Sequence, residues 1–252
     1  MIVEEKKSQA TAHPFEAPDY YLLDEWLTEE HKLIRGTIRS WINEHVTPYI
    51  NQWAQDNHCP RHLVTDMGSM GMFGPSLPEE YGCPGLDEIS YGLIMQEIER
   101  ADSGLRSMAS VQGSLVMYPI YRYGSKEQKQ HYLPKLASGE LMGCFGLTEP
   151  DHGSNPGGMV TRFTDEGDHY LLNGAKTWIS NSPFADLAVV WAKGPDDRIR
   201  GLIVERGLEG FTTPEIHNKW SLRASATGEL VFDNVKVSKA NILPDANGLK
   251  GP

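Results

Sequence analysis

The stretch GCFGLTEPDHGSNPGG, residues 143–158, lies where two kinds of sequence pattern meet. Before it, apolar side chains recur at three-to-four spacing, which is typical of helices. After it, alternating and β-branched runs such as HYLLN, KTWIS and LAVVWA are typical of strands. Because helices fill the first half and antiparallel strands the second, the sequence predicts an α+β protein. An N-terminal all-α domain is followed by an antiparallel β domain.

The first half contains several segments with a helical pattern. Ser125 and Gln128, three residues apart, form a capping box that predicts the start of one helix. The other predicted helices run from Thr28 to before Pro48, over residues 61–70, from about Asp87 to Ala101, and over a stretch of small and apolar residues that ends near Pro119.

The second half contains a strong turn signal. Asn173 and Gly174 stand between two strand-like runs, and this dipeptide predicts a two-residue hairpin turn. Since the helical pattern ends near Gly139, the Gly-rich stretch lies at the junction of two domains, where pockets are common. The predicted parts are a mobile N-terminal arm, a helical domain and a middle β domain, over residues 1–20, 21–139 and 140–252.

The composition excludes several classes of protein. The formal net charge of −11 argues against a nucleic-acid partner, which requires a basic face. The three cysteines show neither pairing nor zinc-ligand spacing, which indicates a reducing compartment and no metal site. No targeting segment is evident, and no apolar run approaches the roughly 18 residues of a membrane span. We therefore expect a cytoplasmic protein.

The Gly-rich stretch carries neither of the usual phosphate-binding fingerprints. It does carry the hydroxyls of Thr148 and Ser154, and a nearby predicted strand carries Trp178 and Ser180. Donors for phosphates together with an indole for an apolar edge suit a planar, phosphate-bearing cofactor. Two simpler interpretations stay open: the glycines form a turn, and Trp178 packs in the core or against a cross-strand neighbour.

Arg106 is the second candidate for a functional residue. It lies in a nearly uncharged predicted helix, and a buried arginine requires an anionic partner. That partner is either a ligand or an internal carboxylate such as Glu99, and the spacing alone favours neither.

Four segments, in the same order, resemble the acyl-CoA dehydrogenase family. GCFGLTEPDHGSNPGG and LNGAKTWISNSPFADL resemble the flavin-binding segments of that family. ERADSGLRSMASVQGSLVMYPI and NKWSLRASATGEL are similar to its glutaryl-CoA dehydrogenase branch. The resemblance covers the chain from about residue 20 onward and implies FAD as the cofactor.

The resemblance also implies roles for single residues. The segment from Phe145 to Ser154 is expected to wrap the FAD, with Leu147 and Thr148 at the pyrimidine edge of the isoalloxazine. The W-I-S strand is expected to pack on the flavin and to place the Ser180 hydroxyl near N5. The implied cofactor-binding residues are Phe145, Gly146, Leu147, Thr148, Gly153, Ser154, Trp178, Ile179 and Ser180.

For the substrate, the resemblance implies that Arg106 and Ser107 bind the distal carboxylate of glutaryl-CoA, with Glu99 close by and Ser154 near the acyl-CoA. Two residues depart from the family pattern. Asn155 stands where the family usually has Asp, and Ser180 stands where it commonly has Thr. Both replacements keep hydrogen-bonding capacity.

The implied reaction is α,β-dehydrogenation of an acyl-CoA, in which a carboxylate removes the α-proton and the β-hydrogen leaves as hydride. For glutaryl-CoA the family reaction continues to crotonyl-CoA with loss of carbon dioxide, as a step of lysine and tryptophan catabolism. The implied partners are an electron-transfer flavoprotein and further copies of the chain in a homotetramer. The implied compartment is the cytoplasm, or the mitochondrial matrix in a eukaryote.

Family members continue into a C-terminal helical domain that carries the catalytic base, whereas this sequence stops at Pro252. We therefore interpret the chain as a fragment without its base and expect it to be inactive by itself. Two other functions stay open. One is a dehydrogenase of a short-chain monocarboxylic acyl-CoA, and the other is a non-catalytic scaffold built on the same fold.

Overall fold

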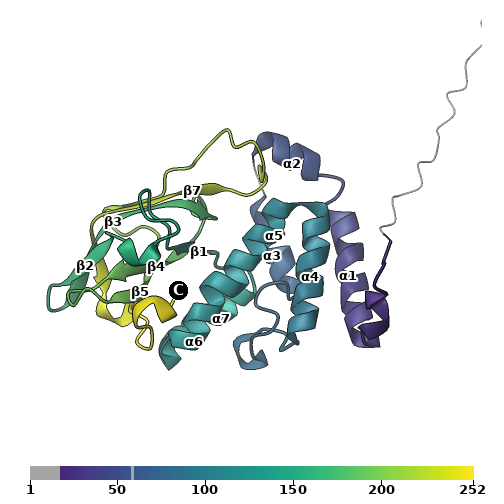
Figure 1. Cartoon of the computed structure of the whole chain (residues 1–252), viewed down its shortest axis with the longest axis horizontal. Helices are drawn as coiled ribbons and strands as arrows, with labels where there is room; N and C mark the ends of the chain where they lie inside the picture. The colour runs from purple at the N-terminus through teal and green to yellow at the C-terminus, as the bar shows by residue number, and fades with distance from the viewer. Residues whose placement is uncertain (1–17, 58–59) are drawn as a thin grey trace, which may run out of the picture.

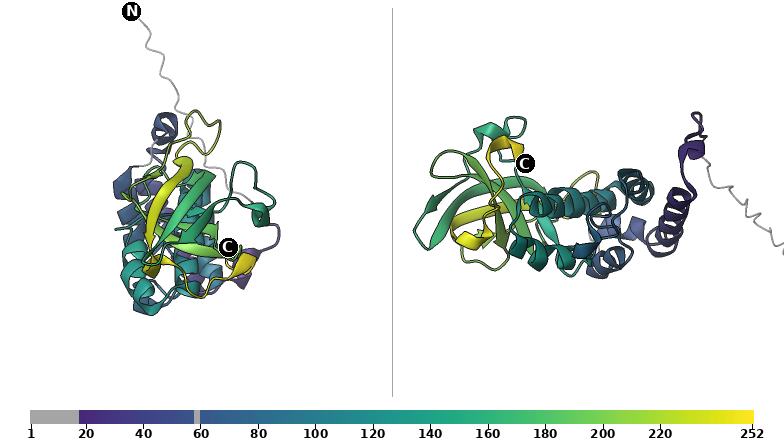
Figure 2. Two further views of the ribbon diagram at one scale, coloured as in Figure 1. Left: turned by 90° about the vertical axis from the view of Figure 1, so that its left-hand side faces the viewer. Right: turned by 90° about the horizontal axis from the view of Figure 1, so that it is seen from below.

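The computed structural model describes residues 18–57 and 60–252. Of the predicted N-terminal arm, residues 1–17 therefore lie outside the described part. Helices gather on one side of the molecule and a curled sheet on the other (Figure 1). Seen from below, the sheet and the first long helix lie at opposite ends of the long axis (Figure 2). Within the described residues, no helix is long and apolar enough to cross a membrane.

The helical half agrees with most of the predicted segments. Thr28 caps the first helix through a capping box with His31, and Ser125 caps the last one through the predicted box with Gln128. The α-helices are α1 (Glu29–His45), α2 (Ile50–Asp56), α3 (Arg61–Ser69), α4 (Glu88–Ala101), α5 (Ser103–Ser110), α6 (Tyr118–Tyr123) and α7 (Lys126–Ala137).

The helix rich in small residues does not end near Pro119, as the sequence predicted. Instead α5 passes into a π-helical segment, η3 (Val111–Met117), which passes directly into α6. Pro119 falls in the first turn of α6, where the proline ring fits the backbone and a missing N–H costs little. The chain therefore remains helical to Tyr123.

The second half forms one mixed sheet in the order β1-β4-β2-β3-β7-β6, and β5 also pairs with β4, off this path. The predicted antiparallel pairing holds for β2–β3, β3–β7, β4–β5 and β6–β7, whereas β1 and β2 pair in parallel with β4. The strands are β1 (Gly143–Gly146), β2 (Arg162–Asp165), β3 (His169–Ser180), β4 (Leu187–Lys193), β5 (Ile199–Glu205), β6 (Phe211–Thr212) and β7 (Thr227–Ser238).

The predicted hairpin at Asn173 and Gly174 is wrong, because β3 runs through both residues without a turn. Its pairing with β7 shifts register between Leu172 and Gly174, which marks a bulge. Gly174 has a φ of 138°, and a Cβ at that position would lie 2.5 Å from the hydroxyl of Thr161. The glycine therefore serves a close approach of two backbone segments within the sheet and not a turn.

The helical half and the sheet share one core. Leu187, Val189 and Trp191 of β4 belong to the apolar cluster that also contains the helices, while Ala188 and Val190 face the inside of the curled sheet. The β4 strand is therefore buried on both faces. This packing places β1 and the Gly-rich stretch after it directly at the boundary between helices and sheet.

Polar contacts also join the two halves. The buried Gln112 side chain of η3 donates to the carbonyl oxygens of Leu136 and Leu141 and accepts from the backbone N–H of Gly143, each at 2.8–2.9 Å. The Gln128 side chain of α7 donates to the carbonyl oxygen of Ala240 at 2.6 Å and to that of Ile242 as well. Side chains of the helical half thus fix the boundary through hydrogen bonds to backbone groups of the sheet half.

Candidate functional site

The glycine loop, residues 147–161, leaves β1 and is held at its base by two buried charges. The Lys176 ammonium in β3 donates to the Glu149 carboxylate at 2.8 Å and to the carbonyl oxygen of Leu147 at 3.1 Å. The same carboxylate accepts from the backbone N–H groups of Val160 at 2.6 Å and Thr161 at 3.0 Å. One ion pair therefore binds both the entry and the exit of the loop.

Both side chains of this pair are inaccessible to solvent, with 0% of Lys176 and 1% of Glu149 exposed. Burial raises the pKa of the Glu149 carboxyl, but the hydrogen bonds from Lys176, Thr161 and Val160 outweigh it and hold that pKa below its ordinary value. Glu149 is therefore an ionised structural carboxylate and is unsuited to act as a proton acceptor.

Trp178 lies further along β3 in an unusual conformation. Its φ is 60°, a left-handed value that is uncommon for a bulky residue, and the pairing of β3 with β7 shifts register between Lys176 and Ile179. The bulge turns the indole outward, so Trp178 is 64% exposed although both neighbours in the strand are buried. Such strain is a mark of functional positions, because packing alone would not select it.

The end of β3 is joined to the helices. Asn181 follows Ser180 and is fully buried, and its side-chain amide donates to the carbonyl oxygens of Met108 in α5 and Gly143 in β1, at 3.4 and 3.3 Å. Met108 lies two residues after Arg106. The second candidate residue therefore stands on the helix that packs against the end of this strand.

Arg106 is half exposed and paired. Its Nε donates to the Glu99 carboxylate at 2.6 Å, and its Nη1 lies 3.4 Å from the Ser110 hydroxyl. The side chains of Arg106 and Glu99 are 37% and 43% exposed. Hydrogen bonds from Ser103 and Arg106 lower the pKa of the Glu99 carboxyl. The internal partner that the sequence allowed is thus present, on a surface that a ligand can reach.

The chain matches two family models. They are "Acyl-CoA dehydrogenase, N-terminal domain" over residues 28–140 and "Acyl-CoA dehydrogenase, middle domain" over residues 144–235. The chain belongs to the acyl-CoA dehydrogenase family.

Individual relatives agree with this assignment. The chain is 40% identical over 225 residues to a glutaryl-CoA dehydrogenase of Desulfococcus multivorans, covering 86% of this chain and 58% of the relative. It is 36% identical to the mitochondrial isovaleryl-CoA dehydrogenase of Pongo abelii, covering 88% of this chain and 54% of that protein. The chain therefore spans somewhat more than half the length of these relatives.

A solved structure is similar over the same part. A glutaryl-CoA dehydrogenase from Mycobacterium smegmatis, crystallised in complex with FADH2, is 48% identical with a TM-score of 0.89. The similarity covers 91% of this chain and 59% of that one. The helical half and the curled sheet are thus arranged as in that enzyme.

The structure brings most of the predicted cofactor residues to one region. Phe145 and Gly146 end β1, where the Phe145 ring packs edge-on against Trp191 with centroids 6.2 Å apart. Thr148 joins the edge of β3, because its carbonyl oxygen accepts from the backbone N–H of Thr177 at 2.9 Å. The half-buried residues are Phe145, Leu147, Thr148 and Ser180; Gly146 and Ile179 are buried; Gly153 and Ser154 are exposed at the loop tip.

The predicted substrate residues lie on the helical side. Arg106 and Ser107 stand in adjacent positions of α5, and Glu99 stands in α4. Ser107 is half-buried, and its carbonyl oxygen accepts from the Ser110 hydroxyl at 3.1 Å. Two further residues were not identified from the sequence. Lys176 holds the glycine loop, and Asn181 joins the end of β3 to α5 and β1.

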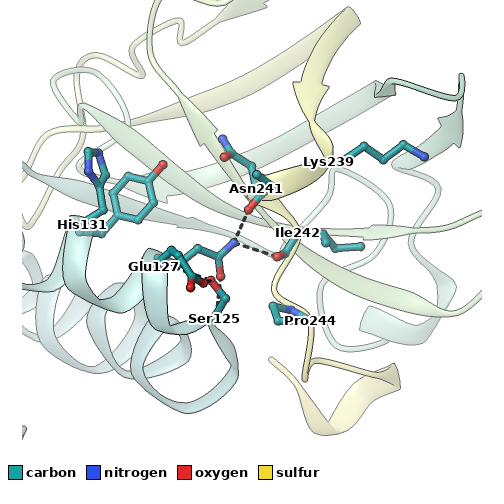
Figure 3. A pocket seen from close by; sticks show the side chains of 10 residues that line it. Ser125, Glu127, His131, Lys239, Asn241, Ile242 and Pro244 are labelled. Carbon is teal, nitrogen blue, oxygen red and sulfur yellow. Dashed lines mark hydrogen bonds between the residues drawn. The ribbon is translucent and has the colours of Figure 1, made fainter.

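A cavity of about 460 Å³ lies elsewhere, between α7 and residues 239–244 (Figure 3). Gln128 spans it with its two hydrogen bonds, and none of the predicted site residues lines it. The cavity follows the boundary between helices and sheet and is separate from the candidate site.

Proposed function

We propose that the complete protein binds FAD and catalyses the α,β-dehydrogenation of an acyl-CoA, with glutaryl-CoA as the substrate. The observation that carries the proposal is the conformation of Trp178. Its strained backbone leaves the indole exposed, beside a loop that carries hydroxyl groups. An exposed aromatic side chain that is kept in spite of a strained backbone suits the binding of a planar ligand.

The residues at this place fit a flavin. Trp178 offers an apolar face, and Thr148, Ser154 and Ser180 offer hydroxyl groups from the loop and the strand. At Gly153 an added Cβ would meet nothing within 4 Å, so the loop tip leaves room for a bulky group. The solved relative that is similar over this part holds FADH2.

The flavin, when bound, supplies the acceptor for the β-hydrogen of the substrate. In this proposal the hydroxyl groups of the loop and strand orient the cofactor, and Trp178 covers its apolar edge. Two of the chain's own carboxylates are unsuited to remove the α-proton, because Glu149 is engaged by Lys176 and Glu99 by Arg106. The base is expected outside residues 1–252.

The choice of glutaryl-CoA rests on Arg106. Among the described residues, its Nη2 makes no hydrogen bond, so this nitrogen is available to a carboxylate. Ser107 stands next to it. Relatives named as glutaryl-CoA dehydrogenases support the same choice.

A monocarboxylic substrate is the second candidate, and one contact favours it. Glu99 already neutralises Arg106, so the surface does not require a negatively charged ligand. Initial rates with glutaryl-CoA and butyryl-CoA decide between the two. Turnover of butyryl-CoA alone would favour the monocarboxylic substrate.

The proposal further takes an electron-transfer flavoprotein as the electron acceptor, a homotetramer as the assembled form and the cytoplasm as the compartment. The first two parts rest on the family resemblance, and the compartment rests on the spacing of the cysteines. Size-exclusion chromatography and reduction of the acceptor flavoprotein test the first two.

The cofactor is expected to be held without a covalent bond. Burial raises the pKa of the Cys144 thiol next to Phe145 to about 12 and that of Cys83 to about 11, so both thiols stay protonated and unreactive. Acid precipitation of the yellow protein should release the chromophore into the supernatant. A colourless protein that gains no stability from FAD would contradict the proposal, and colour that stays in the pellet would contradict the non-covalent bond.

A further inference from the structure

The ion pair at the base of the glycine loop is more than a packing contact. Its two charges make hydrogen bonds to three separate points of the backbone, at Leu147, Val160 and Thr161. These points are the two ends of the loop. Thr161 is in turn fixed to β3, since its hydroxyl donates to the carbonyl oxygen of Ala175 at 3.3 Å.

Next to these ends the loop is attached at Thr148, whose carbonyl oxygen accepts from the backbone N–H of Thr177 at 2.9 Å, and at Met159, which is buried in the core. Glu149 and His152 exchange two backbone hydrogen bonds of 3.2 Å, which close a short turn inside the loop. The tip, with Gly153 and Ser154, is exposed. Because the tip has little packing of its own, its position depends on how firmly the two ends are held.

We propose that Glu149 and Lys176 are positioning residues that hold the glycine loop in its binding conformation before the cofactor arrives. This inference rests on the proposed function, since it takes FAD as the ligand. Neither side chain can touch the cofactor, because both are buried beneath the loop. They act through the backbone of residues 147–161, which they fix against β3.

A loop that is not held must be ordered on binding. Ordering one or two additional residues weakens binding by about 10- to 100-fold. We therefore expect Glu149→Gln, which is nearly isosteric, to raise the Kd for FAD by that factor. It leaves Lys176 without a counter-charge and removes one of the two acceptors at the loop exit.

Amide hydrogen exchange gives a readout that does not need the cofactor. In the protein without FAD, at least one of the amides of Val160 and Thr161 should exchange much faster in Glu149→Gln than in the wild type, because glutamine offers one acceptor oxygen where the carboxylate offers two. The Kd for FAD, measured by titration of its fluorescence, should rise in the same variant.

The matched control is Glu97→Gln. Glu97 is a buried carboxylate in α4, 1% exposed, which accepts from Arg39 at 2.8 Å and from Arg100 at 2.9 Å. Its substitution should lower thermal stability in the same way but leave the loop amides and the Kd for FAD unchanged. The double variant Glu149→Gln with Lys176→Met leaves no buried unpaired charge, so it replaces the single variant if that one does not fold.

The outcomes are distinguishable. Faster exchange at the loop ends together with weaker FAD binding, both absent in Glu97→Gln, supports the positioning role. Unchanged exchange and unchanged Kd in a destabilised loop variant overturn it and leave the pair a structural contact. If the complete wild-type protein does not bind FAD, the proposed function itself fails, and the role assigned to the pair fails with it.

Discussion

Two carboxylate–cation contacts of almost equal length lie on the two sides of the candidate site. Glu149 and Lys176 are 2.8 Å apart on the sheet side, and Glu99 and Arg106 are 2.6 Å apart on the helical side. The first pair is inaccessible to solvent, and the second is roughly two-fifths exposed. The N···O distances are similar, but the first pair also binds backbone groups, whereas the second exposes part of the Arg106 guanidinium to solvent.

The difference teaches that burial, and not distance, separates a structural ion pair from one available to a ligand. A buried charge whose partner is removed has no water to replace it, whereas an exposed charge is solvated at once. The second pair can therefore exchange partners at little cost. The following experiments test this contrast, beginning with the largest expected effect.

The 252-residue chain by itself is expected to show no dehydrogenation. Both pairs keep their carboxylates ionised and engaged, with the pKa values of Glu99 and Glu149 below their ordinary values, whereas a thioester α-proton requires a well-placed and stronger base. Glutaryl-CoA oxidation is followed with added FAD and an artificial electron acceptor. Turnover above the no-enzyme control would contradict the expectation and would make Glu99, Glu149 and Asp151 candidates for the base.

Removing one partner of the buried pair should destabilise the fold strongly. Lys176→Met leaves the Glu149 carboxylate buried without its cation, so we expect the free energy of unfolding to fall by about 3–5 kcal/mol. Arg106→Met, the matched change in the exposed pair, should cost about 0–1 kcal/mol. Denaturant unfolding of both variants measures the contrast, and equal losses would remove burial as the explanation.

The exposed pair should matter for substrate choice. Arg106→Ala in the complete protein should lower kcat/KM for glutaryl-CoA by about 30-fold to several thousand-fold, which corresponds to about 2–5 kcal/mol for a truncated charge pair. The loss with butyryl-CoA should be much smaller, because that substrate has no distal carboxylate. Equal losses with both substrates would assign Arg106 a structural role with Glu99.

A third pair, Asp87 with His31, has one nearly buried and one exposed side chain, and changing it should give the smallest effect. Asp87 is 55% exposed on its side chain, caps α4 and accepts from the ring Nε2 of His31 at 2.8 Å. The hydrogen bond from the Ser90 backbone, followed by that from His31, lowers the pKa of Asp87 from 3.8 to about 2.

Since this folded-state pKa is depressed, the contribution of Asp87 to stability is present above about pH 3.8 and is lost as the pH falls towards about 2. Asp87→Asn keeps a capping side chain but cannot titrate. The variant should therefore be slightly less stable than the wild type at pH 6, and the difference should be clearly smaller at pH 2.5, as measured by unfolding at both values. A constant difference across this range would contradict the prediction.

Much of the fold could be predicted from local signals. The capping box of Ser125 and Gln128 and the cap at Thr28 depend on residues three apart, so the sequence contains all of the information. The hairpin at Asn173 and Gly174 failed because a turn signal is also a bulge signal. Which of the two forms is decided by β7, about sixty residues away.

The candidate site could be predicted only in part. The loop and Trp178 are visible as residue types, but the ion pair below them joins residues 27 positions apart, and its burial depends on the packed sheet. One signal was available. The alternation that places Leu172 inward also places Lys176 on the inward face, and a charged residue there requires a buried partner.

The conformation of Trp178 has a consequence for the evolution of such a chain. A left-handed backbone at a bulky residue costs about 1–3 kcal/mol, and glycine would adopt it freely. Because the indole is largely exposed, Trp178→Gly would lose little packing and should raise the melting temperature of the protein without ligand. A selection for thermal resistance alone would thus drive this position away from tryptophan. Under the proposed function, tryptophan at this position gives up stability for cofactor binding.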